Sequence, residues 1–415
     1  MDAYNDELVY WLWLSRGCTP DSATFPKLIE AFGGDAKTVY EASDRELRQV
    51  LGSRSSDCTR LCNKDLNEAM SLVNFCKTHG VGILHYGLDS YPLSLGEIKT
   101  PPVLLYYRGA LPDFNKMTGI AVVGTRSLTE YGKKNAFNIS YDLARSGATV
   151  ISGMARGIDG VALAGAIAAG GKTVAVIGSG IDVPYPPEHL TLAREIVKQG
   201  CVLTEFPPKT KPDRFNFPKR NRIISALACA TFVVEGEERS GSLITARCAK
   251  EQGKTVFALP GNVGNAKSLA TNLLIKNGAK LCSCAEDIIS EVESKTPGSL
   301  NAFLLSDRKA VDMNCVLSEL KVSALCKDDA LFSSKRARKS ADKPTKNKKE
   351  ETEPKKKTFS GTEGLVYLKI PIDTDCLIEE LVGEECDLRT VMKTLLKLEM
   401  GGHVEILPGE RVRRS

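Results

Sequence analysis

The pattern of apolar and polar positions divides the chain into regions of different periodicity. From Glu7 to Lys77 the apolar residues recur at helical spacing, in short runs that Gly33-Gly34 and Gly52 interrupt. This pattern predicts a small bundle of helices, which we assign to residues 1–85. A connecting stretch follows and leads into an apolar strand at residues 103–107.

Strand and helix patterns alternate in the central region, residues 86–295. Parallel neighbouring strands need crossover connections, so this alternation predicts a parallel sheet with helices on both faces. The expected fold class is α/β, with an extended Rossmann-like sheet as its core. The predicted strands are Ile120–Val123, Thr149–Ser152, Thr173–Ile177, Val202–Thr204, Thr231–Glu235 and Thr255–Leu259.

The periodicity fades after Glu293. The segment from Ser333 to Ser360 is rich in Lys, Arg, Pro, Thr and Glu and cannot bury enough apolar surface to fold, so we assign residues 296–360 to a disordered basic linker. Residues 361–415 are expected to form a winged-helix domain, with two short helices followed by a terminal hairpin. Those helices are predicted at Thr374–Leu381 and Asp387–Met400, and the hairpin between His403 and Arg413.

Composition locates the charge and limits the class of protein. The 415 residues are 42% hydrophobic and 26% charged, enough for two or three domains. The net charge is +5, but Lys335–Lys357 alone carries 11 Lys and Arg against 4 Asp and Glu, so the rest of the chain is at −2. The thirteen cysteines form no dense framework, the first residues are acidic, and no apolar run approaches about 18 residues. We therefore expect a cytoplasmic protein with no membrane segment.

Three successive strands of the predicted sheet end in glycine and small hydroxyl residues. The turns are Gly124-Thr125-Arg126, then Ser152-Gly153, and then Gly178-Ser179-Gly180. In open α/β sheets the carboxyl ends of the strands hold the ligand. A single such turn is as often an ordinary tight turn as a ligand-binding one. Three such turns in succession favour an anion-binding cleft. Gly124, Thr125, Arg126, Ser152 and Gly153 are the candidates from this group.

Two further segments are expected to face the same cleft. The run Phe217-Pro218-Lys219-Arg220-Asn221-Arg222 crowds three cations and an amide behind an aromatic ring. Ser240-Gly241-Ser242 opens a helix, where amides and hydroxyls provide a phosphate site, although a serine N-cap explains the same residues. The expected ligand is a phosphate chain. The candidate ligands are Phe217, Lys219, Arg220, Asn221, Arg222, Ser240, Gly241 and Ser242.

Motifs for nucleotide cofactors, metals and catalysis are weak. Gly171-Lys172-Thr173 and Gly253-Lys254-Thr255 lead from helix into strand, the reverse of a P-loop, and lack its first glycine. No histidine has a nucleophile or carboxylate constellation in sequence, and the cysteine pairs lack zinc spacing. We expect no cofactor, no metal and no enzymatic activity. Glu235 and Asp159 lie near the cleft and keep open the alternative of a nucleotide hydrolase.

Taken in order, these segments resemble the DNA-processing protein A (DprA/Smf) family of bacteria. The resemblance covers roughly 200 residues, from Tyr91-Pro92 through the turns and runs above to Pro260-Gly261. It departs from the family pattern at Ala162-Leu163, where Ala-His is usual. The resemblance implies a helical N-terminal domain, like SAM or helix-hairpin-helix domains, an optional winged helix, and a Rossmann-like domain that binds single-stranded DNA without a nucleotide cofactor. It also implies a homodimer that loads the recombinase RecA during natural transformation.

We therefore expect a single-strand DNA-binding recombination mediator, with a RecA-type recombinase and single-strand-binding protein as partners. In this interpretation Phe217 or Phe215 stacks on a base. Leu269–Ile275, with Leu273 and Leu274, is the candidate dimer face; ordinary packing against the sheet explains the same residues equally well. A nucleotide or nucleoside-monophosphate hydrolase with Glu235 as its base is the enzyme alternative, although Pro260–Asn265 lacks the Pro-Gly-Gly-x-Gly-Thr loop that it needs. A regulator that binds duplex DNA through the winged helix is disfavoured by that module's acidic residues, Glu379, Glu380, Glu384, Glu385 and Asp387, which suit protein contact better.

Overall fold

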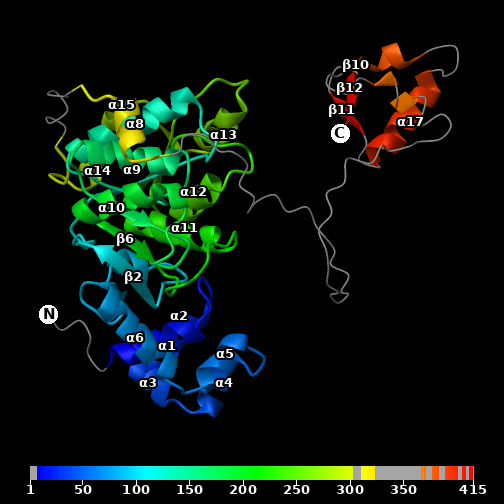
Figure 1. Ribbon diagram of the computed structural model, residues 1–415. Coiled ribbons are helices and arrows are strands. Elements are labelled where there is room, and N and C mark those ends of the chain that lie inside the picture. The colour runs from blue at the N-terminus through cyan, green and yellow to red at the C-terminus, as the bar shows by residue number, and fades with distance from the viewer. Residues whose placement is uncertain are drawn as a thin grey trace. The chain divides into compact units, whose positions relative to one another are not determined.

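The computed structural model divides the chain into two units, Met1–Arg336 and Ala337–Ser415 (Figure 1). In the first unit the structure describes residues 7–301 and 310–322. In the second it describes residues 366–367, 369–370, 376–382, 388–400, 404–407 and 411–414.

A nine-stranded sheet forms the centre of the first unit, in the order β1-β2-β6-β5-β4-β3-β7-β8-β9. The strands from β3 onward run parallel, and β2 is antiparallel to both β1 and β6. The predicted α/β, Rossmann-like class is confirmed. The strands are β1 (Gly82–His85), β2 (Leu104–Gly109), β3 (Gly119–Val123), β4 (Thr149–Ser152), β5 (Thr173–Val176), β6 (Cys201–Thr204), β7 (Ala230–Val233), β8 (Thr255–Ala258) and β9 (Lys280–Leu281).

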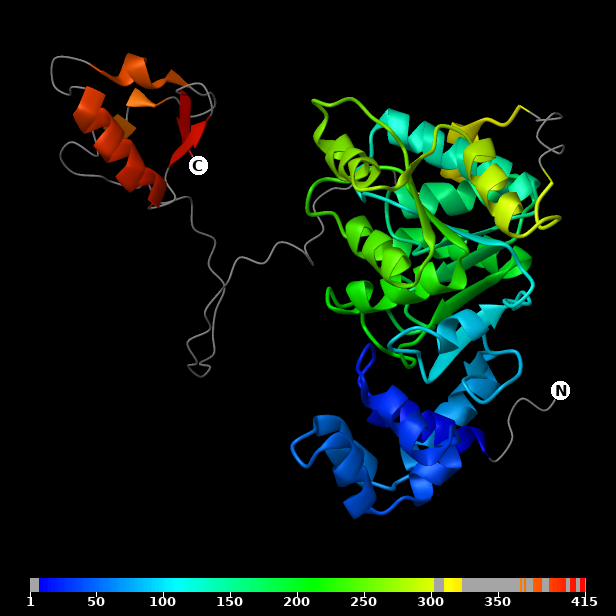
Figure 2. The same ribbon diagram turned by 180° about the vertical axis from the view of Figure 1, so that it is seen from behind.

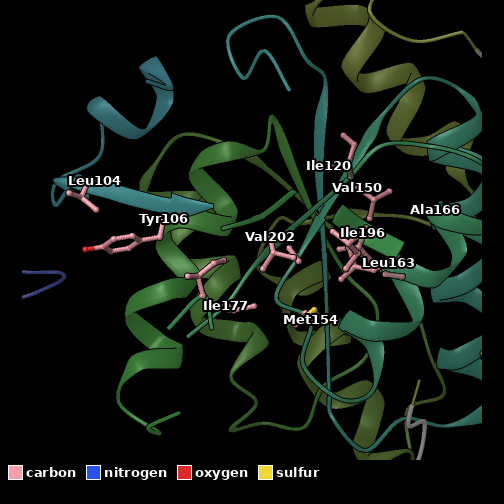
Figure 3. Packing of buried hydrophobic residues seen from close by; sticks show 14 of the residues in the cluster. Leu104, Tyr106, Ile120, Val150, Met154, Leu163, Ala166, Ile177, Ile196 and Val202 are labelled. Carbon is pink, nitrogen blue, oxygen red and sulfur yellow. The ribbon is translucent and has the colours of Figure 1, made fainter. Parts of the chain in front are cut away.

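Strand β3 shows why the sequence forms a two-faced sheet. Its residues are all buried, and successive side chains enter different hydrophobic cores because side chains alternate along a strand. Ile120 and Val122 belong to one core, which Figure 3 shows in part, with Val150 and Leu163 nearby. Ala121 and Val123 belong to the core on the other face.

Helices cover both faces of the sheet (Figures 1 and 2). On the first face lie α8 (Glu130–Arg145), α9 (Ile158–Ala168), α10 (Leu190–Gln199), α14 (Ala285–Lys295) and α15 (Met313–Glu319). On the second face lie α7 (Leu93–Gly96), α11 (Asn216–Leu227), α12 (Ser242–Glu251) and α13 (Leu269–Lys276). Two short 3₁₀ turns, Pro187–His189 and Ala266–Ser268, precede α10 and α13.

The N-terminal helices form a bundle beside the β1–β2 edge of the sheet (Figure 2). Trp11 and Leu12 of α1 share one continuous core with Tyr106 of β2. The sheet starts at β1, inside the range 1–85 assigned to helices, so that boundary lies a few residues too late. The likeness to SAM or helix-hairpin-helix domains stays a prediction. The helices are α1 (Leu8–Gly17), α2 (Thr24–Phe32), α3 (Ala36–Glu41), α4 (Asp44–Leu51), α5 (Ser56–Cys62) and α6 (Asn67–His79).

The folded core extends beyond residue 295, which corrects the predicted start of the linker. Leu300, Leu317, Leu320 and Val322 are buried in the core on the first face of the sheet. The amide of Asn301 also donates a hydrogen bond of 2.8 Å to the Ser146 carbonyl. Residues 299–301 and 310–322 therefore belong to the sheet domain. Residues 302–309 and 323–360 lie outside the described residues.

The second unit contains a three-stranded antiparallel sheet in the order β10-β12-β11. It comprises β10 (Cys376–Leu377), a 3₁₀ helix (Ile378–Leu381), α17 (Leu388–Met400), β11 (Val404–Leu407) and β12 (Arg411–Arg414). The helix predicted at Thr374–Leu381 is wrong, because its described part is a short strand and a 3₁₀ turn. The hairpin and the second helix are present, while the winged-helix assignment stays a prediction.

None of the helices described in either unit has the length and apolarity to cross a bilayer.

We predict that truncation after Thr296 destabilises the sheet domain, whereas truncation after Val322 does not. The shorter chain loses four buried apolar side chains, and the net cost is about 2 kcal/mol or more after the offset from conformational entropy. Urea titrations followed by circular dichroism measure the difference. Equal midpoints for the two chains would mean that α15 packs without stabilising the domain.

Candidate nucleic-acid interface

The two neighbours of β3 in the sheet place a cleft at its carboxyl edge. Strand β3 lies between β4 on one side and β7 on the other, so the loops that follow β3 and β7 diverge. A cleft of about 560 Å³ lies there, lined by these loops and by the first turns of α9, α11 and α12. The cleft lies at the edge of the sheet where the sequence predicts the ligand site, and ligand binding there stays a prediction.

Nine of the thirteen candidate residues line the cleft. They come from three separate segments of the sequence, which the parallel strands bring to one edge. These residues are Gly124, Thr125, Arg126, Phe217, Arg220, Asn221, Ser240, Gly241 and Ser242.

The other four candidates do not line it. Ser152 is fully buried, and its hydroxyl donates a hydrogen bond of 2.6 Å to the Val122 carbonyl. Gly153 lies against the guanidinium of Arg220, so that a Cβ atom at this position would collide with it. Lys219 is half-buried, and its charge acts on the carboxylate of Glu205. Ser152, Gly153 and Lys219 therefore contact neighbouring protein groups and do not line the cleft.

Arg222 is the clearest correction, because it is a structural residue. It is only 5% exposed, and its Nη2 lies 2.7 Å from each carboxylate oxygen of Glu205, which is 7% exposed. Its Nε also lies 3.2 Å from Asp21 Oδ1, although the direction of the N–H is unsuited to a hydrogen bond. Burial raises the pKa of Glu205, and the charge of Arg222 opposes that shift. The pair joins α11 to β6 and to the loop between α1 and α2.

Arg220 lines the cleft but its donors face inward. Its side chain is 4% exposed, and Nη1 donates to the carbonyls of Gly153 and Val176, which end β4 and β5. Nε donates to Asn221 Oδ1 at 3.2 Å. Burial lowers the pKa of Arg220 to about 10, so the guanidinium is still charged at neutral pH.

Asp159 occupies the innermost part of the cleft. Its carboxylate accepts hydrogen bonds from the backbone amides of Gly124 and Ala155 and interacts with the charges of Arg220 and Arg126. Burial raises its pKa, and the two arginines oppose the shift. The Gly124 amide, expected to hold a phosphate, is therefore already engaged. Gly124 has a steric role as well, because a Cβ atom there would collide with Ile158 of α9.

Side chains supply the more exposed donors of the cleft, above all Arg214 and Arg239. Arg126, Arg214, Arg239 and Lys267 line it, and Lys267 Nζ lies 2.5 Å from Glu237 Oε1. The Ser240 and Ser242 hydroxyls lie 2.8 Å apart at the start of α12. The amides of Leu243 and Ile244 close the first turn of that helix, so the hydroxyls are the more available donors. Arg214, Arg239 and Lys267 were missed from sequence, although the first two directly flank the predicted motifs.

Two aromatic side chains near the cleft differ in accessibility. Phe217 is 9% exposed, and Arg126 and Tyr185 lie 5.0 Å and 5.7 Å from its ring centre. Phe215 is 63% exposed, with the Arg214 guanidinium 4.8 Å from its ring. Asp213 accepts a hydrogen bond from the Phe215 amide at 2.8 Å, which fixes the backbone of that residue. Of the two rings, Phe215 is the better placed for stacking.

Glu235, the base of the hydrolase alternative, has a structural role. It is 1% exposed and accepts hydrogen bonds from the amide and hydroxyl of Thr129, at 3.0 Å and 2.5 Å, at the start of α8. It is absent from the lining of the cleft.

Comparison with known proteins places this site in a family. The family model for DNA recombination-mediator protein A matches residues 82–293. The chain belongs to that family. The match confirms the resemblance to DprA/Smf proteins and contains every residue that lines the cleft.

Two relatives and one solved structure are similar over this region. The DNA processing protein DprA of Bacillus subtilis is 41% identical over 219 residues, 53% of this chain and 74% of that protein. The DprA of Streptococcus pneumoniae is 42% identical over 205 residues, 49% of this chain and 72% of that protein. The X-ray structure of DprA from Streptococcus pneumoniae superposes with a TM-score of 0.60 at 33% identity, covering 68% of this chain and 97% of that one.

We predict that Arg222→Ala destabilises this DprA-family domain by about 3–5 kcal/mol, because it leaves the Glu205 carboxylate buried without a partner. Urea unfolding measures the loss. The double change Arg222→Met with Glu205→Gln removes both charges and should cost clearly less. If Arg222→Ala unfolds like the wild type and binds DNA more weakly, the residue is a ligand after all.

Proposed function

We propose that the protein binds single-stranded DNA in the cleft at the carboxyl edge of the sheet and acts as a non-catalytic recombination mediator. The observation that carries this proposal is the set of basic and hydroxyl side chains that line the cleft. Arg126, Arg214 and Arg239 supply charge, and the Ser240 and Ser242 hydroxyls supply further donors. The chain outside Lys335–Lys357 has a net charge of −2, so this positive charge is local.

Single strands fit this arrangement better than duplexes. An exposed aromatic ring such as Phe215 stacks on a base only where base pairing does not hide the base face. The donors that line the cleft suit contacts to the phosphate backbone, which carry no sequence information of their own. We therefore propose binding with little sequence preference.

The alternative of a nucleotide hydrolase loses its main support. The proposed base, Glu235, is buried beneath α8, and its oxygens are hydrogen-bonded to Thr129. Asp159 does reach the cleft, but it is engaged by two amides and two guanidiniums. We propose that the protein acts instead by delivering the bound strand to another protein.

We propose that this recipient is a RecA-type recombinase, loaded onto incoming DNA that single-strand-binding protein covers, in the cytoplasm of a bacterium during natural transformation. The family to which the chain belongs supports the mediator role. We propose that the side chains at the cleft bind the strand directly, without a cofactor.

We also propose self-association through α13. Leu269 and Leu273 are 48% and 45% exposed on this helix, whereas Leu274 is buried against the sheet. Ordinary packing explains Leu274 and does not explain the two exposed leucines. Two exposed leucines one turn apart suit a symmetric helix contact.

We predict that the full chain binds labelled single-stranded DNA more tightly than duplex DNA of equal length. Arg126→Ala and Arg239→Ala should each weaken binding by at least about 1 kcal/mol, or roughly fivefold, because each removes a charge-assisted phosphate contact. Fluorescence polarisation over a salt series measures both effects, and the wild-type slope should be about −0.7 per phosphate contacted.

Arg247→Ala is the matched control, since Arg247 is exposed on α12 and lies outside the cleft. Its affinity should equal that of the wild type. Equal affinity of the wild type for single strand and duplex would refute the proposal. A loss of affinity in Arg126→Ala together with a lower thermal midpoint would instead assign that residue to the fold.

We predict that the double change Leu269→Asp with Leu273→Asp converts a dimer into a monomer, as sedimentation at micromolar concentration would show.

For the mediator role, we predict that the wild type accelerates strand exchange by a RecA-type recombinase on DNA coated with single-strand-binding protein. A monomeric wild type would refute self-association, and absence of stimulation with a cognate recombinase would refute the mediator role.

A further inference from the structure

The deepest anion-binding position of the cleft is filled by the protein itself. It lies where the end of β3 meets the start of α9, and its donors are the amides of Gly124 and Ala155 and the charges of Arg220 and Arg126. The Asp159 carboxylate accepts both amide hydrogen bonds and interacts with both charges, and it is only 7% exposed. A Cβ atom at Gly153 would meet both Asp159 Oδ2 and the Arg220 guanidinium, which shows how closely these two groups converge.

This position is where a parallel α/β sheet ordinarily binds the phosphate of a small ligand. A strand end followed by a glycine turn and a helix N-terminus directs amides at an anion, and the helix dipole adds positive potential. Here the same donors face a side-chain carboxylate. A phosphate monoester that entered would lie against that negative charge, and it carries about 1.5 to 2 negative charges of its own at neutral pH.

A strand of DNA meets a different set of donors. Its internal phosphodiesters each carry a single charge and continue into sugar on both sides, so they cannot enter a closed position end-on. Arg214, Arg239 and the Ser240 hydroxyl lie further out, on segments after β6 and β7. These donors suit phosphates that pass across the mouth of the cleft.

We propose that Asp159 is a specificity-determining residue, which fills the innermost phosphate position and thereby restricts the cleft to internal phosphates of a strand, excluding mononucleotides and terminal phosphates. The proposal rests on the function proposed above in one respect, namely that the outer cleft binds DNA. The blocking of the inner position by Asp159 stands independently of that function.

The first test uses inorganic phosphate and no DNA. In Asp159→Ala of the full chain, the vacated position should bind phosphate, so that the thermal midpoint rises by about 3–5 °C when phosphate is about tenfold above its dissociation constant, at constant ionic strength in chloride. The wild type should show no such rise. Glu235→Ala is the matched control, because it also removes a buried carboxylate that accepts a backbone amide, but outside the cleft.

A rise confined to Asp159→Ala supports the proposal, and equal shifts in all three proteins, or none in Asp159→Ala, overturn it. Asp159→Ser keeps one acceptor for the helix start and replaces Asp159→Ala if that variant does not fold. The same criterion then applies.

The second test uses DNA and the wild type. Short single strands with a 5′-phosphate or a 5′-hydroxyl should bind within about twofold of each other, and deoxyadenosine monophosphate should not compete. A preference of more than about fivefold for the 5′-phosphate, or competition by the mononucleotide, overturns the proposal. If the wild type binds no single strand at all, the proposed function fails, while the phosphate titration still decides the role of Asp159.

Discussion

The cleft depends on one buried cation, the guanidinium of Arg220. The Gly153 carbonyl directly follows β4 and the Val176 carbonyl ends β5, and Arg220 donates to both. A buried charge is tolerated only when it is paired, and Asp159 provides the opposite charge from the first turn of α9. Arg220 therefore fixes the first turns of α9 and α11 against the strand ends, and the outer side chains of the cleft are arranged around that fixed centre.

The arginines of the run from Phe217 to Arg222 have different partners because they lie on different sides of α11. Successive residues of a helix are rotated by about 100°, so residues two apart point to nearly opposite sides. Arg220 accordingly faces the strand ends, while Arg222 faces Glu205 and Asp21. Through Asp21, the same helix that lines the cleft also contacts the N-terminal bundle, and Thr100 donates a hydrogen bond of 2.7 Å to that aspartate. The bundle and the cleft thus share α11 as a common support.

Charge in the cleft is layered. The inner layer, Arg220 with Asp159, is close to neutral and holds the backbone in place. The outer layer contains the exposed Arg214 and Arg239, from the loops after β6 and β7, whereas the half-buried Arg126 lies between the layers because its charge also acts on Asp159. Because Asp159 neutralises Arg220, the exposed arginines supply the positive charge of the cleft, where solvent and salt compete with a bound polyanion.

The sequence by itself determined the architecture, because that information is local. The apolar strands at Ile120–Val123 and Thr149–Ser152, each followed by a glycine turn and a helix, are enough to predict a parallel sheet and a ligand edge, and motifs such as Gly124-Thr125-Arg126 were sufficient to predict the cleft and the family. Only the tertiary structure decided which cations are ligands and which are supports. Arg222 and Arg220 look like surface cations in sequence, yet their partners Glu205 and Asp159 are 17 and 61 positions away along the chain, and burial depends on contacts that no local pattern contains. The same limit hid α15, whose short apolar pattern at Leu317 and Leu320 gains meaning only from the surface of α9 on which it packs.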